Sequence, residues 1–313
     1  MKKFIKTLIC IILAVILSCS AVYPYVIKKY GDISVQTIGS RTTDDISLIA
    51  ECQKRREEND IRIMSANLFA DYEGFGGSFV TPRASQFIAV REAFSPDVVA
   101  LQEMSFNWHC CLQNNNGSYK MVRPLSTFIL MKMTALIYNS EKLRLIKSGD
   151  IEYENSDDIR TRRAVWGMFS QRNTGKTFIV VSTHLSFLGE NGSGSSIETI
   201  EAQADALSAL VRTLKKENNC PVIIAGDFNA KEAPDVDNTV GASEVYKKLA
   251  KKYRDARFAS KEHFYGTEKT VNNLLNDHIF IKGNVQCAAY SILSFKCLES
   301  MSDHYPIFAD VRL

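Results

Sequence analysis

The sequence predicts an α/β protein in which packed sheets are covered by outer helices. Three observations support this fold class. Short apolar runs rich in Val and Ile recur along the chain at the length of strands. Segments with helical spacing of apolar residues lie between these runs, and the longest covers about residues 195–216. The chain has 313 residues, 45% of them hydrophobic, which is enough for one large layered domain.

The first half of the folded body contains most of the predicted strands. A strand over residues 61–67 precedes a helix that starts at Thr81-Pro82 and ends at Ser95-Pro96, because Pro suits the first helical position and the residue before Pro disfavours helix. Residues 97–101 form the next strand, with Gln102-Glu103 at its end. Further strands are predicted at residues 135–138, 143–146, 164–169 and 178–182.

The second half contains the longest helix and the last strands. In residues 195–216 one apolar stripe runs through Ile197, Ile200, Ala204, Leu207, Val211 and Leu214. A buried strand over residues 221–225 and a short helix around Val245 and Leu249 follow. The last strands are predicted at residues 277–281, 288–293 and 307–313. In the final strand, alternation separates Ile307, Ala309, Val311 and Leu313 from Phe308, Asp310 and Arg312.

The N-terminus predicts export. Lys2, Lys3 and Lys6 precede an uncharged stretch over residues 7–27, which is the pattern of a secretory signal. The stretch could be cleaved after its small residues, could carry lipid on Cys19 because Ile16-Leu17-Ser18-Cys19 resembles a lipobox, or could stay as a membrane anchor. Each outcome places the body outside the cytoplasm. We therefore divide the chain into a leader (1–29), a polar spacer (30–60) and one folded domain (61–313).

Charge and cysteine content limit the function classes. The formal charge is +3, but residues 1–29 hold five lysines and no acid, so the remainder has 33 basic and 35 acidic residues. This balance argues against a strongly basic nucleic-acid binder, although a nuclease that contacts phosphate through a metal stays open. Six cysteines follow the leader, and disulfides among them are permitted in an exported chain, with the pairing left open.

Polar side chains gather at the ends of the predicted strands, where one cleft could collect them. Asp227 and Asn229 follow a buried strand two residues apart and therefore point the same way. Oxygen donors of this kind suit Mg²⁺ and phosphate, and histidine can donate to a phosphate oxygen. Any one of these residues alone would be an ordinary turn or structural residue, but they recur in series: Asn67, Glu103, His184, Asp227, Asn229, Asp277, Asp303 and His304.

The order and spacing of these motifs resemble the endonuclease/exonuclease/phosphatase superfamily over about residues 61–313. The motifs are Asn67, Leu101-Gln102-Glu103, Ser182-Thr183-His184-Leu185, Gly226-Asp227-Phe228-Asn229, Asn276-Asp277-His278-Ile279 and Ser302-Asp303-His304-Tyr305-Pro306. The resemblance implies a four-layered α/β sandwich, with two packed mixed sheets flanked by helices. It also implies a metal-dependent hydrolase of phosphoester bonds that uses Mg²⁺, with Mn²⁺ as a candidate substitute.

The resemblance also implies a role for each matched residue. Glu103 is the main metal ligand, with Asn67 beside it and Asp303 on the metal side. Asp227 and Asn229 orient the attacking water and hold the phosphate. His304, oriented by Asp277, and His184 face the phosphate. We interpret His278 as structural. Arg162 and Arg163 stand where relatives carry a phosphate-contacting arginine, and a solvated charge pair explains them equally well.

The substrate is less well defined by the sequence. Ser105 stands where pancreatic-type deoxyribonucleases carry an arginine, and an exported leader does not suit an intracellular repair enzyme. Phe75, Phe79, Phe106 and Trp108 could be the exposed aromatics of a sphingomyelinase, and core packing explains them equally well. We expect an extracytoplasmic, membrane-associated phosphodiesterase of nuclease type. The alternatives are a sphingomyelinase-like phospholipid phosphodiesterase, a phosphomonoesterase, or a surface-attached binding protein without turnover. We expect no obligate protein partner.

Overall fold

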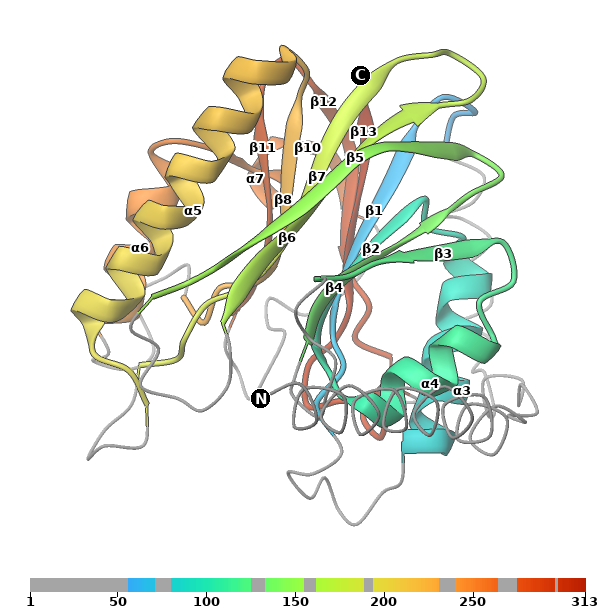
Figure 1. The fold of residues 1–313 in the computed structure, drawn as a ribbon, viewed down its shortest axis with the longest axis horizontal. Coiled ribbons are helices and arrows are strands. Elements are labelled where there is room, and N and C mark those ends of the chain that lie inside the picture. The colour runs from blue at the N-terminus through green and yellow to red at the C-terminus, as the bar shows by residue number, and fades with distance from the viewer. Residues whose placement is uncertain are drawn as a thin grey trace, which may run out of the picture.

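Two sheets packed face to face, with helices on both outer sides, form the protein (Figure 1). The computed structural model describes residues 56–70, 80–124, 133–154, 162–188, 194–230, 240–263, 275–295 and 298–313. The predicted leader, most of the spacer, and Phe75 and Phe79 lie outside the described residues. None of the described helices is both long and apolar enough to cross a bilayer.

The first sheet has seven strands and is covered by α3 (Val80–Phe94) and α4 (Phe106–Asn114). Its two central strands, β1 and β2, are parallel, whereas β13 is antiparallel to β1. In spatial order the strands are β10 (Ser260–His263), β12 (Gln286–Ile292), β13 (Ile307–Arg312), β1 (Ile61–Asn67), β2 (Val98–Met104), β4 (Met133–Asn139) and β3 (Tyr119–Val122).

The second sheet has six strands, and α5 (Ile197–Asn218) and α6 (Val240–Ala250) cover its outer face. The parallel pair β7 and β8 lies at its centre, with antiparallel neighbours on both sides. A short helix, α7 (Ala256–Ala259), follows its edge strand β9. In spatial order the strands are β5 (Leu143–Glu152), β6 (Arg163–Gln171), β7 (Thr177–His184), β8 (Val222–Asp227), β11 (Asp277–Lys282) and β9 (Arg254–Asp255).

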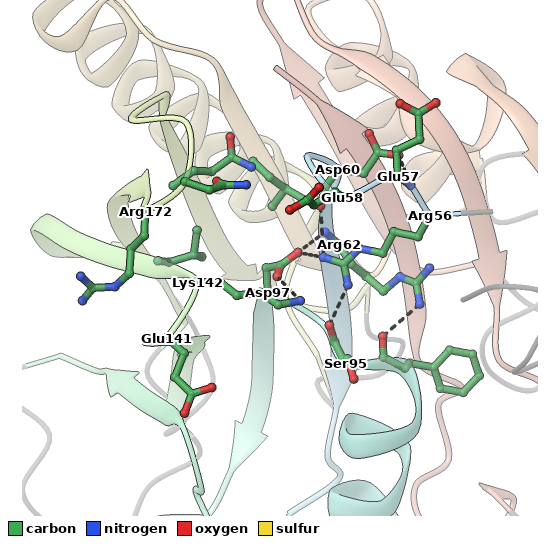
Figure 2. A pocket seen from close by; sticks show the side chains of 15 residues that line it. Arg56, Glu57, Glu58, Asp60, Arg62, Ser95, Asp97, Glu141, Lys142 and Arg172 are labelled. Carbon is green, nitrogen blue, oxygen red and sulfur yellow. Dashed lines mark hydrogen bonds and ion pairs between the residues drawn. The ribbon is translucent and has the colours of Figure 1, made fainter. Parts of the chain in front are cut away.

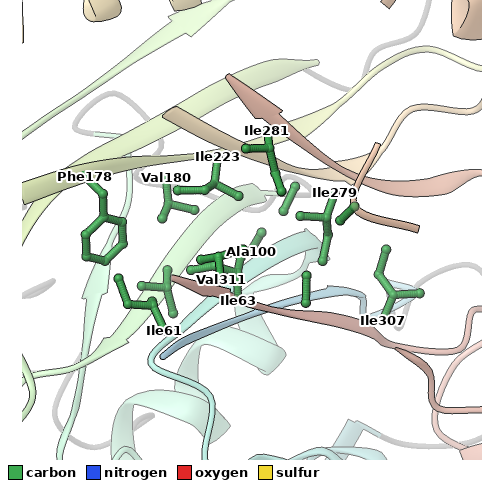
Figure 3. Packing of buried hydrophobic residues seen from close by; sticks show 14 of the residues in the cluster. Ile61, Ile63, Ala100, Phe178, Val180, Ile223, Ile279, Ile281, Ile307 and Val311 are labelled. Atoms are coloured by element: carbon green, nitrogen blue, oxygen red, sulfur yellow. The ribbon is translucent and has the colours of Figure 1, made fainter. Parts of the chain in front are cut away.

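Branched aliphatic side chains fill the space between the sheets (Figure 3). Ile63 and Val311 from the first sheet lie in one buried cluster with Val180, Ile223 and Ile279 from the second. The opposite faces of the same strands are buried under the helices, so the central strands are buried on both sides. The layers are therefore helices, sheet, sheet and helices, which confirms the predicted four-layered sandwich.

Most predicted elements form, and five short ones were missed: α4, β3, β9, α7 and β10. The strand expected over residues 61–67 is β1, and the apolar stripe of the long helix is buried on α5. Phe106 and Trp108, considered above either as exposed aromatics or as core residues, lie in α4, and Trp108 is fully buried against Phe87. Ser105 begins this helix because its hydroxyl accepts a hydrogen bond from the Trp108 amide at 3.3 Å. Trp108 therefore cannot serve as an exposed membrane-contacting residue.

Among the described residues, the cysteines form no disulfide. Cys110, Cys111, Cys220 and Cys287 are buried with free thiols. Burial raises the pKa of Cys287 to about 12 and that of Cys110 to about 11, so both stay protonated near neutral pH. These four cysteines therefore behave as small core side chains.

A cavity of about 480 Å³ opens at the ends of the strands farthest from the predicted site residues (Figure 2). Its buried carboxylate Asp97 already has partners. Asp97 accepts a hydrogen bond from the Arg62 amide at 2.7 Å, contacts the Arg56 guanidinium, and lies 3.3 Å from Lys142 Nζ. None of the predicted site residues lines this cavity. The hydrogen bond and ion pairs of Asp97 connect the beginnings of β1, β2 and β5.

Candidate active site

The predicted site residues come together where the ends of both sheets meet. In the second sheet the strand register places His184 beside Asp227, and Asp227 beside Asp277. Asn67 ends β1 in the first sheet, and its Nδ2 donates to Asp227 Oδ2 at 3.0 Å. This hydrogen bond joins the two sheets at the site. All these side chains are buried, so the sheet packing holds them in place.

Asp227 is at the centre of the cluster. Its Oδ1 accepts a hydrogen bond from the Asn229 amide at 2.9 Å, and its Oδ2 lies 3.3 Å from His184 Nε2 and 3.9 Å from His304 Nε2. Burial alone would raise the pKa of this carboxyl, but the positive charge of His304 and the hydrogen bond from the Asn229 amide lower it below its usual range. Asp227 is therefore an ionised carboxylate inside the protein, able to accept a proton or orient a water molecule.

His304 is held as a cation by Asp277. The His304 Nδ1 atom lies 2.7 Å from Asp277 Oδ2. Burial opposes the charge, but Asp277 and then Asp227 outweigh it and raise the pKa of His304 to about 10. Since 3.9 Å is too long for a hydrogen bond to Asp227, the Nε2–H group of His304 is available to an oxygen placed between them. This arrangement suits the donation of a hydrogen bond to a phosphate.

His184 has the opposite character. Its Nε2 accepts a hydrogen bond from the Arg162 guanidinium and lies 3.3 Å from Asn229 Nδ2. Burial, together with the charge of Arg162, lowers the pKa of His184 and keeps the imidazole neutral. Asn229 Nδ2 also donates to the Leu185 carbonyl at 2.9 Å, which fixes the loop after β8 against β7. The two histidines of the site therefore differ in charge.

Arg162 belongs to the site, whereas Arg163 does not. Arg163 points to the edge of the sheet and lies 2.8 Å from both Asp150 and Glu152. The sequence left these two arginines undecided. Their contacts separate them, because the Arg162 guanidinium donates to His184 Nε2 whereas the two carboxylates of β5 hold Arg163. The strand register alone would not, since Arg163 is the direct partner of His184.

The residues predicted as metal ligands gather on the first-sheet side. Glu103 has a left-handed backbone (φ 54°) at an irregularity between β2 and β4, a distortion that re-aims its side chain. Its Oε2 accepts a hydrogen bond from the Ala70 amide at 3.3 Å. Burial, and then the negative charges of Glu103 and Asp227, raise the pKa of Asp303 to about 6, although His304 acts against this shift. Crowded carboxylates of this kind are an oxygen-only donor set that fits Mg²⁺.

Asn67 links this oxygen set to the rest of the site. Its Oδ1 accepts a hydrogen bond from the Phe69 amide at 3.0 Å, which leaves one lone pair for a cation. The Ser302 hydroxyl donates to the Asn67 carbonyl at 2.7 Å and lies 3.3 Å from Asp303 Oδ1. Ser302 therefore positions both residues, although its role was not predicted.

A second group of potential ligands lies nearby. Ligand atoms of Asp227, Asp277 and His304 all lie within 4.8 Å of one another. A protonated imidazole cannot bind a metal ion, and Asp277 keeps the proton on His304. We therefore favour Asn67, Glu103 and Asp303 as the metal side, and these assignments stay predictions.

The arrangement of charges suits hydrolysis of a phosphoester. A bound divalent cation would supply positive charge to the phosphate oxygens. Asp227, ionised and fixed by Asn67 and Asn229, can orient a water molecule and receive its proton. His304 can donate to the charge that develops on the phosphate, and Arg162 lies next to His184 on the other side.

This fold and this cluster define an enzyme of the phosphoester-hydrolysing class. A family model described as "Endonuclease/Exonuclease/phosphatase family" matches residues 64–304, which is most of the chain. The chain belongs to this family, which is metal-dependent and hydrolyses phosphoester bonds. A comparison with curated proteins gives no match.

Solved structures with the same fold have low sequence identity to this chain. An endonuclease/exonuclease/phosphatase from Bacteroides vulgatus is 20% identical, with a TM-score of 0.68 over 82% of this chain and 100% of that one. The Bacteroides thetaiotaomicron mannosyl-6-phosphatase Bt3783 is 18% identical, with a TM-score of 0.62 over 81% and 100%. The D. rerio TDP2 in complex with a single-strand DNA product is 17% identical, with a TM-score of 0.56 over 82% and 100%.

Proposed function

We propose that the protein hydrolyses phosphodiesters with Mg²⁺, or Mn²⁺ in its place, and that nucleic acid is its substrate. The pairing of an ionised Asp227 with a cationic His304, next to an oxygen-only ligand set, carries the proposal. Asp227 Oδ2 and His304 Nε2 lie 3.9 Å apart, so one phosphate oxygen or one attacking water beside them can contact both. The solved TDP2 complex with a single-strand DNA product supports nucleic acid as the substrate class.

A phosphomonoester is the second candidate substrate. The mannosyl-6-phosphatase with the same fold favours it, since the same cluster can attack a phosphate with one or two ester bonds. The sphingomyelinase alternative is weaker, because Trp108 is buried and, among the described residues, the exposed large hydrophobic side chains are Ile146 and Phe258. Ile146 lies in β5 and Phe258 in α7, and neither element carries a predicted site residue. A binding role without turnover is disfavoured by the intact set of site residues.

The proposal includes an extracytoplasmic location and membrane association through residues 1–29. It rests on the lysines and the apolar stretch of the leader, which the sequence provides. Fractionation of cells that produce the full chain tests it. Recovery of the protein in the cytoplasmic fraction would contradict this part of the proposal and leave the chemistry unaffected.

The activity is tested with the full chain, with and without Mg²⁺. The substrates are single- and double-stranded DNA, RNA, sphingomyelin, a small phosphodiester and a sugar phosphate. Asp227→Asn is the matched control, because it keeps the shape of the side chain and removes its charge. We expect Mg²⁺-dependent cleavage of nucleic acid that the variant loses. Cleavage of the sugar phosphate alone would favour the second candidate, and no turnover of any substrate would contradict the proposal.

The ligand assignment has a separate readout. A ligand that binds only the folded state raises its stability, so Mg²⁺ should raise the melting temperature of the wild-type chain. Glu103→Gln should lose most of this increase while it keeps the melting temperature of the metal-free protein within a few degrees. An unchanged Mg²⁺ effect in this variant would remove Glu103 from the metal site.

A further inference from the structure

A second cavity, of about 530 Å³, lies on the helix-covered side of the six-stranded sheet. One wall is an edge of α5, on which Ser208, Arg212 and Lys215 follow at helical spacing. The facing wall comes from Lys252, just after α6, and Lys282, at the end of β11. We call this cavity the basic groove. Figure 1 shows α5 and α6 side by side on this side of the molecule.

The basic groove concentrates positive charge in a chain whose body has slightly more acidic than basic residues. Asp205 is the one acid among its lining residues, and it lies 2.7 Å from Lys248 Nζ and 3.5 Å from Lys252 Nζ. Its charge is thus already balanced. The cations that line the groove are Arg212, Lys215, Lys216, Lys252 and Lys282.

Neutral groups hold part of this charge in place. Val211 and Tyr253 are buried and form the floor, and Lys282 Nζ lies 5.7 Å from the centre of the Tyr253 ring. Lys282 also donates to the Lys252 carbonyl at 3.0 Å, and Lys252 donates to the Ser208 hydroxyl at 3.2 Å. Lys252 shares its charge with Asp205, whereas the groups that orient Lys282 carry no net charge. The positive charge of Lys282 is therefore retained for an anion.

Helix electrostatics explain only part of the pattern. Lys215 and Lys216 lie in the last turn of α5, where cations favour the helix dipole. Arg212 lies before that turn, and Lys252 and Lys282 belong to other elements. Three separate segments thus bring cations to the same concave surface, which points to a polyanionic ligand.

We propose that the basic groove binds the phosphate backbone of a nucleic-acid strand whose scissile bond lies in the active site. This inference rests on the nuclease function proposed above. β11 runs from Asp277 in the site to Lys282 in the groove, a span of about 17 Å at strand geometry. A long strand can therefore contact both places, whereas a small phosphodiester reaches only the active site.

An anionic lipid surface is the other polyanion to consider. Peripheral membrane binding adds apolar insertion to charge attraction. The exposed large hydrophobic side chains of the described residues, Ile146 and Phe258, do not line the groove. The concave shape also suits a chain of phosphates better than a flat surface. We therefore assign nucleic acid as the partner.

The test replaces three groove cations in the full chain, as Arg212→Gln/Lys215→Gln/Lys216→Gln. Gln has nearly the same helix propensity as Arg and Lys, so α5 should form, and circular dichroism checks this. The matched control is Lys120→Gln/Arg144→Gln/Lys261→Gln, which removes the same charge at exposed positions outside the groove. The probe is a labelled oligothymidylate of about 20 nucleotides, with EDTA to prevent cleavage.

Fluorescence anisotropy then gives the dissociation constant at several salt concentrations. We expect the groove variant to bind about tenfold or more weakly at low salt, with the control close to wild type. The slope of log K against log salt should decrease by about 2, because three phosphate contacts to a single strand are lost. Hydrolysis of the small phosphodiester should stay unchanged, while KM for the oligonucleotide rises.

Failure of the groove and failure of the nuclease function give different results. Oligonucleotide cleavage with equal affinity in both variants would overturn the groove and leave the nuclease function standing. Groove-dependent binding without cleavage of any nucleic acid would contradict the nuclease function and support the groove. Binding of phosphatidylglycerol vesicles that the groove variant loses, without oligonucleotide binding, would overturn nucleic acid as the partner.

Discussion

Gly226 shows how closely β7 and β8 approach each other. A Cβ atom at this position would lie 2.0 Å from the Thr183 carbonyl oxygen, a contact that backbone atoms cannot relieve without moving. Thr183 and Gly226 are register partners directly before His184 and Asp227. The absence of a side chain at Gly226 therefore sets the separation of the two site residues that follow.

Gly226→Ala should consequently reduce both stability and activity. Forcing β7 and β8 apart should cost about 1–3 kcal/mol of unfolding free energy, as overpacked sites do, and should lower kcat more than tenfold by moving Asp227 from His184. Urea unfolding and steady-state kinetics measure the two effects. Gly175→Ala is a useful control, because no atom lies within 4 Å of the added Cβ, although its positive φ adds some strain. Wild-type activity in Gly226→Ala would disprove this packing argument.

Asp277 should act on catalysis through His304. Without the carboxylate, the pKa of His304 should fall from about 10 toward its ordinary value of 6.5. Asp277→Asn should therefore lose the imidazolium as the pH rises above about 6.5, whereas the wild type keeps it up to about 10. We expect kcat of the variant to be lower by about a hundredfold at pH 8, with a smaller deficit at pH 6. A pH-independent deficit would indicate a purely structural role.

At the scale of elements, the sequence predicts long apolar segments well and short ones poorly. β1 and the stripe on α5 form as predicted, because each is long enough to display its own period. α4 has only nine residues, and its buried Trp108, Cys111 and Leu112 are too few to distinguish a helix from a loop. The four-residue β3 is recognisable only from its pairing with β4. Such elements depend on tertiary contacts.

The candidate site could also be predicted only where its residues flank long apolar strands. Asp227, His184 and Asp277 could be predicted because each ends or begins a strongly apolar strand. The choice between Arg162 and Arg163 needs the side-chain contacts of each, because the register alone pairs Arg163 with His184. The orientation of Glu103 needs the irregularity in β2. Both are three-dimensional properties that a single sequence does not encode in a short motif.

The contact between β11 and α6 contains a buried histidine that titrates. His278 Nδ1 lies 3.2 Å from Asp255 Oδ2, and its Nε2 lies 2.9 Å from the Ala230 carbonyl. Burial disfavours the charge, but Asp255 and the carbonyl outweigh it and raise the pKa of His278. Tyr246 packs on the ring, with centroids 4.9 Å apart. As predicted, this histidine is structural.

The raised pKa makes stability depend on pH with a defined sign. The folded protein holds the proton more tightly than the unfolded chain, so this contribution is complete below about pH 6.5 and disappears as the pH rises through the folded pKa. His278→Gln cannot gain or lose this proton. We expect the decrease in unfolding free energy between pH 6 and pH 9 to be smaller in the variant, measured by urea unfolding. Parallel pH profiles would contradict the assignment.

At the scale of the whole molecule, the site depends on two sheets that meet through an apolar layer. Phe178 is the second residue of β7 and is fully buried between Phe169 and the first sheet, at the opposite end of the strand from His184. Asn67 and Asp227 make their inter-sheet hydrogen bond at the site end. Stability and catalytic geometry should therefore respond differently to a cavity at the far end.

Phe178→Ala tests whether the site residues keep their positions when packing is lost at the other end of β7. The cavity should lower the unfolding free energy by about 3–5 kcal/mol, because a large buried aromatic side chain is removed. The site end of β7 lies about six residues away, where Asn67 and Asp227 make their hydrogen bond. We therefore expect kcat, measured well below the melting temperature, to stay within about threefold of wild type.

Asn67→Ala should show the reverse pattern, with a modest loss of stability and a large loss of kcat, since it removes the link between the sheets at Asp227. Equal losses of kcat in Phe178→Ala and Asn67→Ala would contradict this. They would mean that the whole interface between the sheets positions the site residues.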